Sequence, residues 1–364
     1  MNYKSRKVSV VIPVYNGEKY LPDCLESLKY QTAEAAPVIV VDNKSSDNSL
    51  KLLSEFRIQN PELRIISNKN NAGFAKACNQ GIEEAIRSEA DFIFLLNQDT
   101  ICEPDCLEEL VKVAHEDEKI FAVQALLLRW PEKDRIQTSG NKIHFLGFGY
   151  CGDYNNSKFK ISRSRTNSLR GRQNSKFKDI TYASGAGMLI NVSALKKNGF
   201  FDEDLFLYHE DLDLGLRARF LGYKILLAPQ AIVYHKYTAG IPPHRWYWSE
   251  RGRQIVLLKF YKIPTLILIF PAWLLMEIGI LLYSLLTGWF WLKIKSYFSV
   301  LRQLPRTLRK RRLIQKTRYV SDRRLIGLFE TRFNFTGFEH SLLKYIVNPF
   351  FDLWGRFIKY LIWW

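Results

Sequence analysis

Cysteine is scarce in this chain, and its spacing argues against two kinds of scaffold. The 364 residues contain five cysteines, at positions 24, 78, 102, 106 and 151, and no Cys-x-x-Cys pair. An odd number of cysteines without such pairs indicates neither a disulfide framework nor a structural zinc site. We therefore expect a reduced, cytosolic setting.

A secretory leader pattern is also missing. The chain begins MNYKSRKVSVVIPVY, where the apolar run is about six residues long, shorter than a signal peptide needs. We expect a buried strand at this position and no signal peptide.

Acidic residues are few in the C-terminal third. Residues 256–364 carry 18 Lys and Arg against 5 Asp and Glu, whereas residues 1–255 carry 35 against 31. Such a basic segment attracts polyanions, which are either nucleic acid or an anionic membrane surface. The apolar fraction of 47% is enough for a globular core, and the length suits two domains, or one large domain with an extension.

Strands and helices alternate through the first 115 residues. Apolar or β-branched runs predict four buried strands, at Val8–Val14, Val38–Val41, Leu63–Ser67 and Phe92–Leu96. Helical spacing follows each run and predicts four helices, at Glu18–Tyr30, Ser45–Phe56, Phe74–Arg87 and Glu103–His115. This alternation predicts an α/β fold whose parallel sheet is covered on both faces.

Polar side chains follow three of these predicted strands. Tyr15, Asp42 and Asp99 each stand just beyond a strand end. Open parallel sheets bind ligands beyond the carboxyl ends of their strands. Three such residues in separate strand–helix units therefore predict a binding site at this edge of the sheet.

The segment 141–180 differs in composition from its surroundings. It is rich in Gly, Ser and Asn, and Lys158–Lys178 contains eight basic residues and no acid. We expect a long mobile loop that is either a solvated linker or a functional segment, namely a lid or a clamp for an acceptor phosphate. Ser184–Ile190 then predicts a small-residue turn entering a strand.

Carboxylates crowd together in residues 201–219, FDEDLFLYHEDLDLGLRAR. Glu210, Asp211 and Asp213 fall within four residues, directly after His209. Crowded carboxylates repel one another, so at least one of them accepts a proton readily, as an enzyme needs to deprotonate a hydroxyl group. A solvated acidic helix start explains this stretch equally well when it is considered alone.

The segment Ile263–Leu292 is nearly all apolar, and Glu277 is its one charged residue. It is long enough to cross a bilayer, although a fully buried core helix is an alternative. Lys293–Arg324 mixes Arg and Lys with Leu and Ile, and Tyr345–Trp364 is rich in aromatic residues. These two patterns predict helices that lie on an anionic membrane surface.

Several segments occur together in an order that points to one family. They are VSVVIPVYNGEKYLPDCLESL, VDNKSSDNS, NAGFAKACNQGI, LLNQDT, SGAGMLI, FDEDLFLYHEDLDLGLRARFLGYKI and APQAIVYHK, across residues 7–255. The chain resembles the family 2 glycosyltransferases of the GT-A fold, and among them the rhamnosyltransferase-like members of cell-surface polysaccharide biosynthesis. The resemblance implies transfer of a sugar from a dTDP- or UDP-linked donor, with rhamnose as one candidate sugar.

A metal site follows from the same resemblance. A divalent cation, Mg2+ or Mn2+, would offset the negative charge on the departing diphosphate. The family's Asp-x-Asp motif reads Asn97-Gln98-Asp99 here, so an amide replaces the first carboxylate. Asp99 is the expected main ligand, with His235 as the second and Asn97 offering an amide oxygen. The alternative for His235 is an ordinary capping or core histidine.

The resemblance assigns the catalytic base to Asp211, with Glu210 as the fallback. One base and no protein nucleophile imply a single displacement that inverts the anomeric configuration. Asp213 is expected to cap a helix or to pair with Arg217, four residues on.

Nucleotide contacts are expected from loops at the strand ends. Asp42 would accept a hydrogen bond from N3–H of uracil or thymine, or it would cap a turn instead. Segment 247–253 resembles a motif that closes over the donor, where Arg251 or Arg253 would meet the diphosphate. The expected nucleotide-binding residues are Pro13, Tyr15, Asn16, Asp42, Lys76, Asn79, Gln98 and Arg253.

These expectations divide the chain into a GT-A domain at 1–255, a membrane-inserted segment at 256–292 and basic surface helices at 293–364. Nucleotide sugars are cytosolic, and basic segments favour the same side, so both flanks of the apolar segment face the cytosol. We therefore expect a re-entrant hairpin or interfacial helices, bent near Pro271 or Gly279, at the cytoplasmic membrane. A true span is the alternative. The implied acceptor is a saccharide linked to a polyprenyl diphosphate.

Three rival interpretations stay open in the sequence. The first is a soluble or peripheral glycosyltransferase that acts on a non-lipid acceptor and uses the apolar segment as an interface in a homo-oligomer. The second is a nucleic-acid-binding protein, but no recognisable module of that kind is present, and we expect no nucleic-acid partner. The third is a catalytically inactive relative, which Asn97 motivates.

Overall fold

The structure is a computed structural model that describes residues 6–157, 177–236, 243–333, 341 and 343–364. The basic stretch for which a linker or lid is predicted lies largely outside the described residues, as do residues 1–5. The chain forms two compact units. The sheet unit comprises Met1–Asn141, Cys151–Phe206 and Tyr223–Thr238, and the helical unit comprises Lys142–Tyr150, Leu207–Gly222 and Ala239–Trp364.

The sheet unit is built on one mixed sheet of ten strands, in the order β10-β12-β6-β11-β4-β1-β2-β3, with β5 on β12 and β7 on β6. Strands β1 to β4 pair in parallel as β3-β2-β1-β4, and β11 then runs antiparallel to β4. The strands are β1 Val8–Val14, β2 Val38–Asp42, β3 Leu63–Ser67, β4 Phe92–Leu96, β5 Thr100–Cys102, β6 Ile120–Arg129, β7 Ile136–Thr138, β10 Lys178–Asp179, β11 Gly187–Asn191 and β12 Lys224–His235.

The four predicted strands and the four predicted helices of the N-terminal half are confirmed. The helices are α1 Leu21–Lys29, α2 Ser49–Gln59, α3 Phe74–Arg87 and α4 Cys106–Ala114. Helix α2 begins four residues later than predicted because the preceding residues bind the first loop. The Ser45 hydroxyl accepts the Asn16 N–H, at 2.9 Å, and the Asp47 carboxylate accepts the Glu18 N–H, at 3.0 Å.

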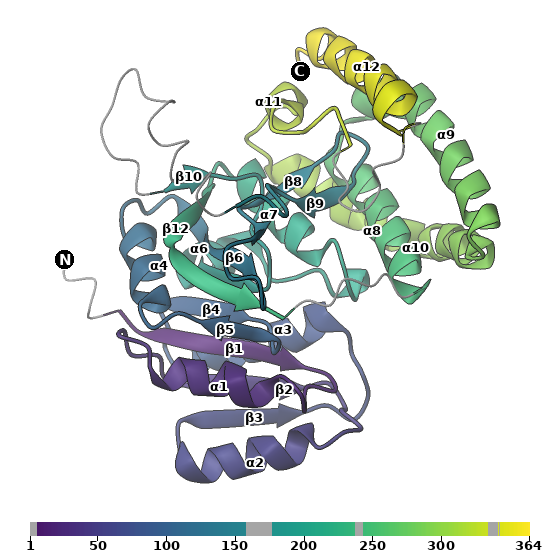
Figure 1. Cartoon of the computed structure of the whole chain (residues 1–364). Helices are drawn as coiled ribbons and strands as arrows, with labels where there is room; N and C mark the ends of the chain where they lie inside the picture. Colours follow the sequence, from purple (N-terminus) through teal and green to yellow (C-terminus); the bar gives the residue numbers. More distant parts are fainter. Residues whose placement is uncertain (1–5, 158–176, 237–242, 334–340, 342) are drawn as a thin grey trace. The chain divides into compact units, whose positions relative to one another are not determined.

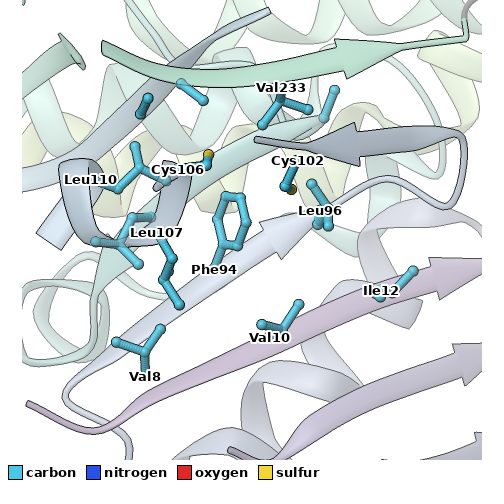
Figure 2. Packing of buried hydrophobic residues seen from close by; sticks show 14 of the residues in the cluster. Val8, Val10, Ile12, Phe94, Leu96, Cys102, Cys106, Leu107, Leu110 and Val233 are labelled. Atoms are coloured by element: carbon cyan, nitrogen blue, oxygen red, sulfur yellow. The ribbon is translucent and has the colours of Figure 1, made fainter. Parts of the chain in front are cut away.

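The core of the sheet unit lies between α4 and the strands β1 and β4. Figure 2 shows Cys106, Leu107 and Leu110 of α4 facing Val8 and Phe94 on these strands. Apolar area removed from water in this way is the main stabilising contribution of the fold. It holds the strands in a register that keeps Val14 beside Asp42, so their carboxyl ends align.

Close packing on the other side depends on a glycine. A Cβ atom at Gly81 of α3 would come within 2.3 Å of a methyl carbon of Val11 on β1. Helix α3 therefore lies directly on the strand, with no room for a side chain at this position.

All five cysteines carry thiols, as the sequence predicts. Cys24, Cys78, Cys102 and Cys106 are buried, and Cys151 is partly exposed. The sheet unit also contains α6 Val192–Asn198 and the short 3-10 helix η2 Glu203–Leu205. A two-stranded sheet joins β8 Asn141–Ile143 to β9 Gly149–Cys151.

The helical unit gathers helices from separate parts of the chain (Figure 1). Helix α10 packs along α8, and α9 contacts both α10 and α12. The helices are α7 Glu210–Phe220, α8 Pro243–Phe260, α9 Ile263–Leu286, α10 Phe290–Thr317, α11 Asp322–Gly327, the π-helix η3 Leu343–Val347 and α12 Asn348–Leu361.

Helix α9 is continuous, and this corrects the expected bend. It runs through both Pro271 and Gly279 and is long and apolar enough to cross a membrane by length and composition. Pro271 lies on the exposed side of the helix, where its ring has room and one missing N–H is tolerated. The chain instead reverses after α9, where Gly288 adopts a φ of +79° that favours glycine.

Candidate active site

Three strand-end loops are bonded together at the carboxyl edge of the sheet. The Tyr15 N–H donates to Gln98 Oε1 at 2.9 Å, and Gln98 Nε2 donates back to the Tyr15 carbonyl at 3.1 Å. Asn16 Oδ1 accepts the Ser46 N–H at 2.8 Å. The loops after β1, β2 and β4 are thus fixed to one another before any ligand arrives, and Gln98 is the residue that joins the first to the last.

The other residues expected at the nucleotide have protein partners in this structure. Asp42 is buried, and its carboxylate accepts the backbone N–H groups of Lys44 and Ser45, each at 3.2 Å, so it caps the turn after β2. Buried Asn79 exchanges two hydrogen bonds with the backbone of Phe201, at 2.9 and 3.0 Å. Pro13 is buried within β1.

Tyr15, Asn16 and Lys76 are the exposed members of this group. The Tyr15 side chain is 48% exposed. Lys76 Nζ lies 3.9 Å from a Glu203 carboxylate oxygen, and both side chains are about half exposed. An exposed aromatic ring and an exposed ammonium group suit contacts with a nucleotide base and its phosphates.

Asp99 and His235 lie together, as the resemblance implies. Antiparallel pairing of β5 with β12 places His235 opposite Thr100. His235 Nε2 lies 3.0 Å from Asp99 Oδ1, and His235 Nδ1 lies 2.7 Å from Gln137 Oε1. Burial raises the pKa of Asp99, but the adjacent His235 outweighs this effect and leaves that pKa below its usual value.

Gln137 is a site residue that the sequence did not indicate. It lies on β7, which the chain folds back against β6, so only strand pairing brings it to His235. Histidines that bind metals commonly donate their second ring N–H to an oxygen, which fixes the tautomer. Gln137 provides such an oxygen and directs Nε2 toward Asp99.

The donor atoms around Asp99 fit a hard divalent cation. Asn97 Oδ1 is buried and has no hydrogen-bond partner among the described residues, so the lone pairs of this amide oxygen are unused. Across the described residues, no three His, Cys, Asp or Glu side chains form a cluster of metal-binding size. A cation here would therefore depend on the Asn97 amide and on oxygens brought by the ligand, as Mg2+ and Mn2+ sites commonly do.

A strained turn presents the acidic cluster at the start of α7. Phe206, Tyr208 and His209 have φ values of 56°, 63° and 66°, in the left-handed region that favours glycine. Each such residue costs about 1–3 kcal/mol, and strain of this kind gathers at functional sites. The turn places Glu210 and Asp211 in the first turn of the helix.

The three carboxylates of α7 have different surroundings. Asp213 is fully buried and pairs with Lys259 and, at 2.9 Å, with Arg217, so the predicted pair with Arg217 is confirmed. Glu210 is also buried, and burial together with Asp211 and Asp213 raises its pKa well above the usual value, which favours its protonated form. Asp211 is the partly exposed member of the three.

His209 is held in place by two glycines. Its Nε2 donates to the Gly147 carbonyl at 3.2 Å, and a Cβ atom at Gly252 would lie only 3.0 Å from its ring. Burial lowers the pKa of His209 to about 4, so the ring is neutral near pH 7. This buried ring therefore fixes the backbone immediately before Glu210.

The two arginines expected at the diphosphate are engaged inside the helical unit. Arg253 is fully buried and pairs with Glu250 at 2.6 Å and with Glu277. Arg251 is 2% exposed and donates to Ser299 Oγ at 3.0 Å. Neither guanidinium presents an exposed edge to a ligand, and we do not include them in the candidate site.

The candidate residues are divided between the units. The cation ligands expected from the sequence and Gln137 belong to the sheet unit, whereas His209, Glu210 and Asp211 belong to the helical unit.

Comparison with known proteins gives one family and a set of distant relatives. The sequence model of Glycosyl transferase family 2 matches residues 9–199. Poly-beta-1,6-N-acetyl-D-glucosamine synthase of Staphylococcus aureus strain COL is 26% identical over 272 residues, covering 72% of this chain and 60% of the relative. The synthase of Staphylococcus epidermidis is 25% identical over 258 residues, covering 70% and 57%. The chain thus spans less than two thirds of the length of these relatives.

A solved structure supports the fold. The crystal structure of GalNAc-T7 with UDP, GalNAc and Mn2+ superposes with a TM-score of 0.57 at 15% identity, covering 71% of this chain and 48% of that one. This likeness and the family match confirm the expected GT-A open sheet.

Proposed function

We propose that this chain, which belongs to glycosyl transferase family 2, transfers a sugar from a nucleotide-diphospho-sugar to a hydroxyl group. The proposed transfer inverts the anomeric configuration. The observation that supports this most directly is the contrast within the acidic cluster. Asp211 is partly exposed, whereas Glu210 is buried in surroundings that favour its protonated form and Asp213 is buried in ion pairs. One carboxylate is therefore suited to act as a base.

In the proposed step, Asp211 accepts the proton of the acceptor hydroxyl while that oxygen attacks the anomeric carbon. The bond from this carbon to the diphosphate breaks at the same time, and the nucleoside diphosphate leaves with the electron pair. The proton on Asp211 then passes to solvent. A single base and a single displacement give inversion without a covalent intermediate on the protein.

A divalent cation, Mg2+ or Mn2+, fits the sheet unit beside Asp99. Asp99 and His235 would hold it, with the buried Asn97 oxygen as a third donor and Gln137 orienting the imidazole. When bound, such a cation offsets the charge that develops on the diphosphate.

The donor is proposed to be a dTDP- or UDP-sugar, with rhamnose as one sugar to test. The exposed Tyr15 ring and the Lys76 ammonium group would contact the nucleotide, on loops that Gln98 and Asn16 hold in place. Asp42 would have to accept N3–H of the base in addition to the amides it already caps.

The acceptor is proposed to be a saccharide carried on polyprenyl diphosphate at the cytoplasmic membrane, with the sheet unit in the cytosol. The apolar helix α9 and the basic residues that follow it support this location. Transfer to a free saccharide at the same rate, without lipid or detergent, would favour the alternative of a soluble enzyme.

The test combines ligand binding with turnover. UDP, dTDP and their sugars are screened by thermal shift with and without Mn2+, and transfer is measured with the donor that binds. Asp211→Asn should lower the rate of transfer by about 10²–10⁴-fold while the thermal shift with the nucleotide persists. Glu118→Gln, an exposed carboxylate on the sheet unit, is the matched control. Full activity in Asp211→Asn would rule out the proposed base.

A further inference from the structure

Helix α9 turns its polar residues inward and its apolar residues outward. Thr265, Glu277 and Ser284 are among its buried side chains. A helix that packs on a protein core in water shows the opposite arrangement. The exposed residues of α9 include Ile263, Ile267, Phe270, Leu274, Leu275, Ile278, Leu282, Tyr283, Leu285 and Leu286.

The inward face is tied to other helices by polar contacts. Thr265 Oγ1 donates to Asp322 on α11 at 2.5 Å, and Trp364 Nε1 donates to Thr265 Oγ1 at 3.0 Å. Glu277 pairs with Lys293 of α10 at 2.7 Å and with Arg253 of α8. Since protein covers one face over most of its length, α9 does not meet lipid on all sides as a lone spanning helix would.

The apolar surface continues on neighbouring elements of the same unit. Helix α12 contacts α9, and α10 follows α9 directly after the turn at Gly288. Exposed apolar residues on α10, η3, α12 and the residues that follow α12 include Trp291, Phe298, Leu301, Tyr345, Ile346, Phe350, Leu353, Phe357, Tyr360 and Trp363. Trp and Tyr among them suit the headgroup zone of a bilayer.

Charge on this part of the chain is nearly all of one sign. Each described acid after residue 255 lies in an ion pair, namely Glu277 with Lys293, Asp322 with Arg318, Glu330 with Lys142, and Asp352 with Arg332 and Arg356. By contrast, many basic residues are exposed, including Arg302, Arg309, Arg312, Lys316, Arg323, Arg324 and Lys344. An apolar face flanked by exposed Arg and Lys matches an anionic bilayer surface.

We propose that the helical unit docks on one leaflet of an anionic membrane without crossing it. The outward faces of α9 and α12 enter the hydrocarbon, and the basic residues of α10 and α11 meet the phosphate groups. This docking rests on the proposed function, because its role would be to bring the enzyme to a lipid-borne acceptor. Under this proposal α9 lies in the plane of the membrane surface and does not span the bilayer, which is the alternative given in the sequence analysis.

Vesicle flotation of the purified full chain tests the docking. The chain should float with phosphatidylcholine vesicles that contain phosphatidylglycerol, and less with phosphatidylcholine alone or at high salt. Leu274→Glu combined with Leu282→Glu should abolish flotation, whereas Ile58→Glu, on an exposed apolar residue of α2, should not change it. Reversing Arg309 and Arg312 to Glu should weaken binding at least about fivefold for each residue.

A labelling experiment separates lying from spanning. Lys262→Cys and Thr287→Cys, at the two ends of α9, are each made in a Cys151→Ser background and exposed to an impermeant maleimide in sealed vesicles of known orientation. Docking on one leaflet predicts that both ends react from the cytosolic side alone. Reaction of the two ends from opposite sides would overturn it.

Two further outcomes bear on the proposal. If the chain stays in solution with every vesicle and forms a dimer that Leu274→Glu breaks, the outward face of α9 binds a second copy and the docking is refuted. The nucleotide thermal shift is measured in parallel with the same Leu274→Glu, Leu282→Glu variant in detergent. If this variant keeps the nucleotide thermal shift but no longer floats, the two substitutions have removed docking alone, which supports the docking. If the unmodified chain floats but binds no nucleotide, the result contradicts the proposed function and leaves the docking intact.

Discussion

His209 links the packing against Gly252 to the position of the acidic cluster at the start of α7. A Cβ atom at Gly252 would lie 3.0 Å from three atoms of His209, so Gly252→Ala must shift the ring and the start of α7 with it. We expect kcat to fall by up to about 10-fold, with little change in the donor KM, because the ring must move by a few tenths of an ångström and a misplacement of about 1 Å costs about 10²-fold. Steady-state kinetics provide the measurement.

The matched control for this change is Gly279→Ala. A Cβ atom there meets nothing within 4 Å, and we expect wild-type kinetics. Equal kcat values for the Gly252 and Gly279 variants would show that the packing of Gly252 against His209 does not position Asp211.

Gln137 acts on the cation site through the histidine ring. Gln137→Ala removes the oxygen that accepts His235 Nδ1–H, at 2.7 Å, and frees the ring to turn or change tautomer. We expect the Mn2+ concentration at the midpoint of the nucleotide thermal shift to rise about 10–100-fold. Gln137→Glu keeps an acceptor and should restore most of the affinity. An unchanged midpoint in Gln137→Ala would mean that His235 is not a ligand.

The sequence could indicate Asp99, His235 and Asp211 as candidate site residues because each lies within a short contiguous segment that resembles a family motif. Gln137 could not be found in this way, since strand pairing alone brings it to His235. The sequence also could not predict that Arg253 forms buried ion pairs, because its two carboxylate partners come from α8 and α9. Side chains whose roles depend on distant partners therefore escaped the sequence analysis.

At the scale of the elements, three helices share a buried charge cluster. Glu250 and Arg253 of α8, Glu277 of α9 and Lys293 of α10 are each at most 4% exposed and carry two charges of each sign. Lys293→Met leaves the two carboxylates with one cation fewer, and breaking a buried pair costs about 3–5 kcal/mol. We expect this loss in the free energy of unfolding, measured with urea in mild detergent.

Lys316→Met is the control for the charge cluster. Lys316 is exposed near the end of the same helix, and its loss should change the free energy of unfolding by no more than about 0.5 kcal/mol. Equal stability of the two variants would show that the cluster does not hold the helices together.

The elements of the sheet unit followed from the sequence because each apolar run has the length of a strand or the period of a helix. Helix starts were less predictable, since Ser45 and Asp47 bind the first loop and delay α2. The prediction of a bend near Pro271 was wrong because its ring has room on the exposed face of α9. The chain reverses instead at Gly288, whose positive φ allows the reversal.

At the scale of the whole molecule, two buried histidines make stability depend on pH. His144 donates through Nε2 to the Thr331 carbonyl at 3.1 Å and accepts the Leu146 N–H at Nδ1, an arrangement that requires the neutral ring. Burial lowers the pKa of His144 to about 3 and that of His209 to about 4. Near pH 5 the folded chain therefore keeps both rings neutral, whereas the unfolded chain binds protons on both.

Stability should accordingly be highest above about pH 6.5 and fall as the pH drops toward 4. Each histidine lowers the free energy of unfolding by about 1.6 kcal/mol between pH 6.5 and 5. Urea unfolding at these two values measures the loss, and His144→Phe should remove about half of it. A flat profile in the unmodified chain would contradict the prediction.

The ion pairing of the C-terminal acids has a practical consequence. Helices α10 and α11 together carry eleven basic residues and one acidic residue, Asp322, which pairs with Arg318, so their exterior acts as an anion exchanger. Heparin resin should retain the chain until the eluting salt is high, and ribosomal debris from a lysate should adhere to the same face. Absorbance at 260 nm that disappears after a high-salt wash would report this adsorption during purification.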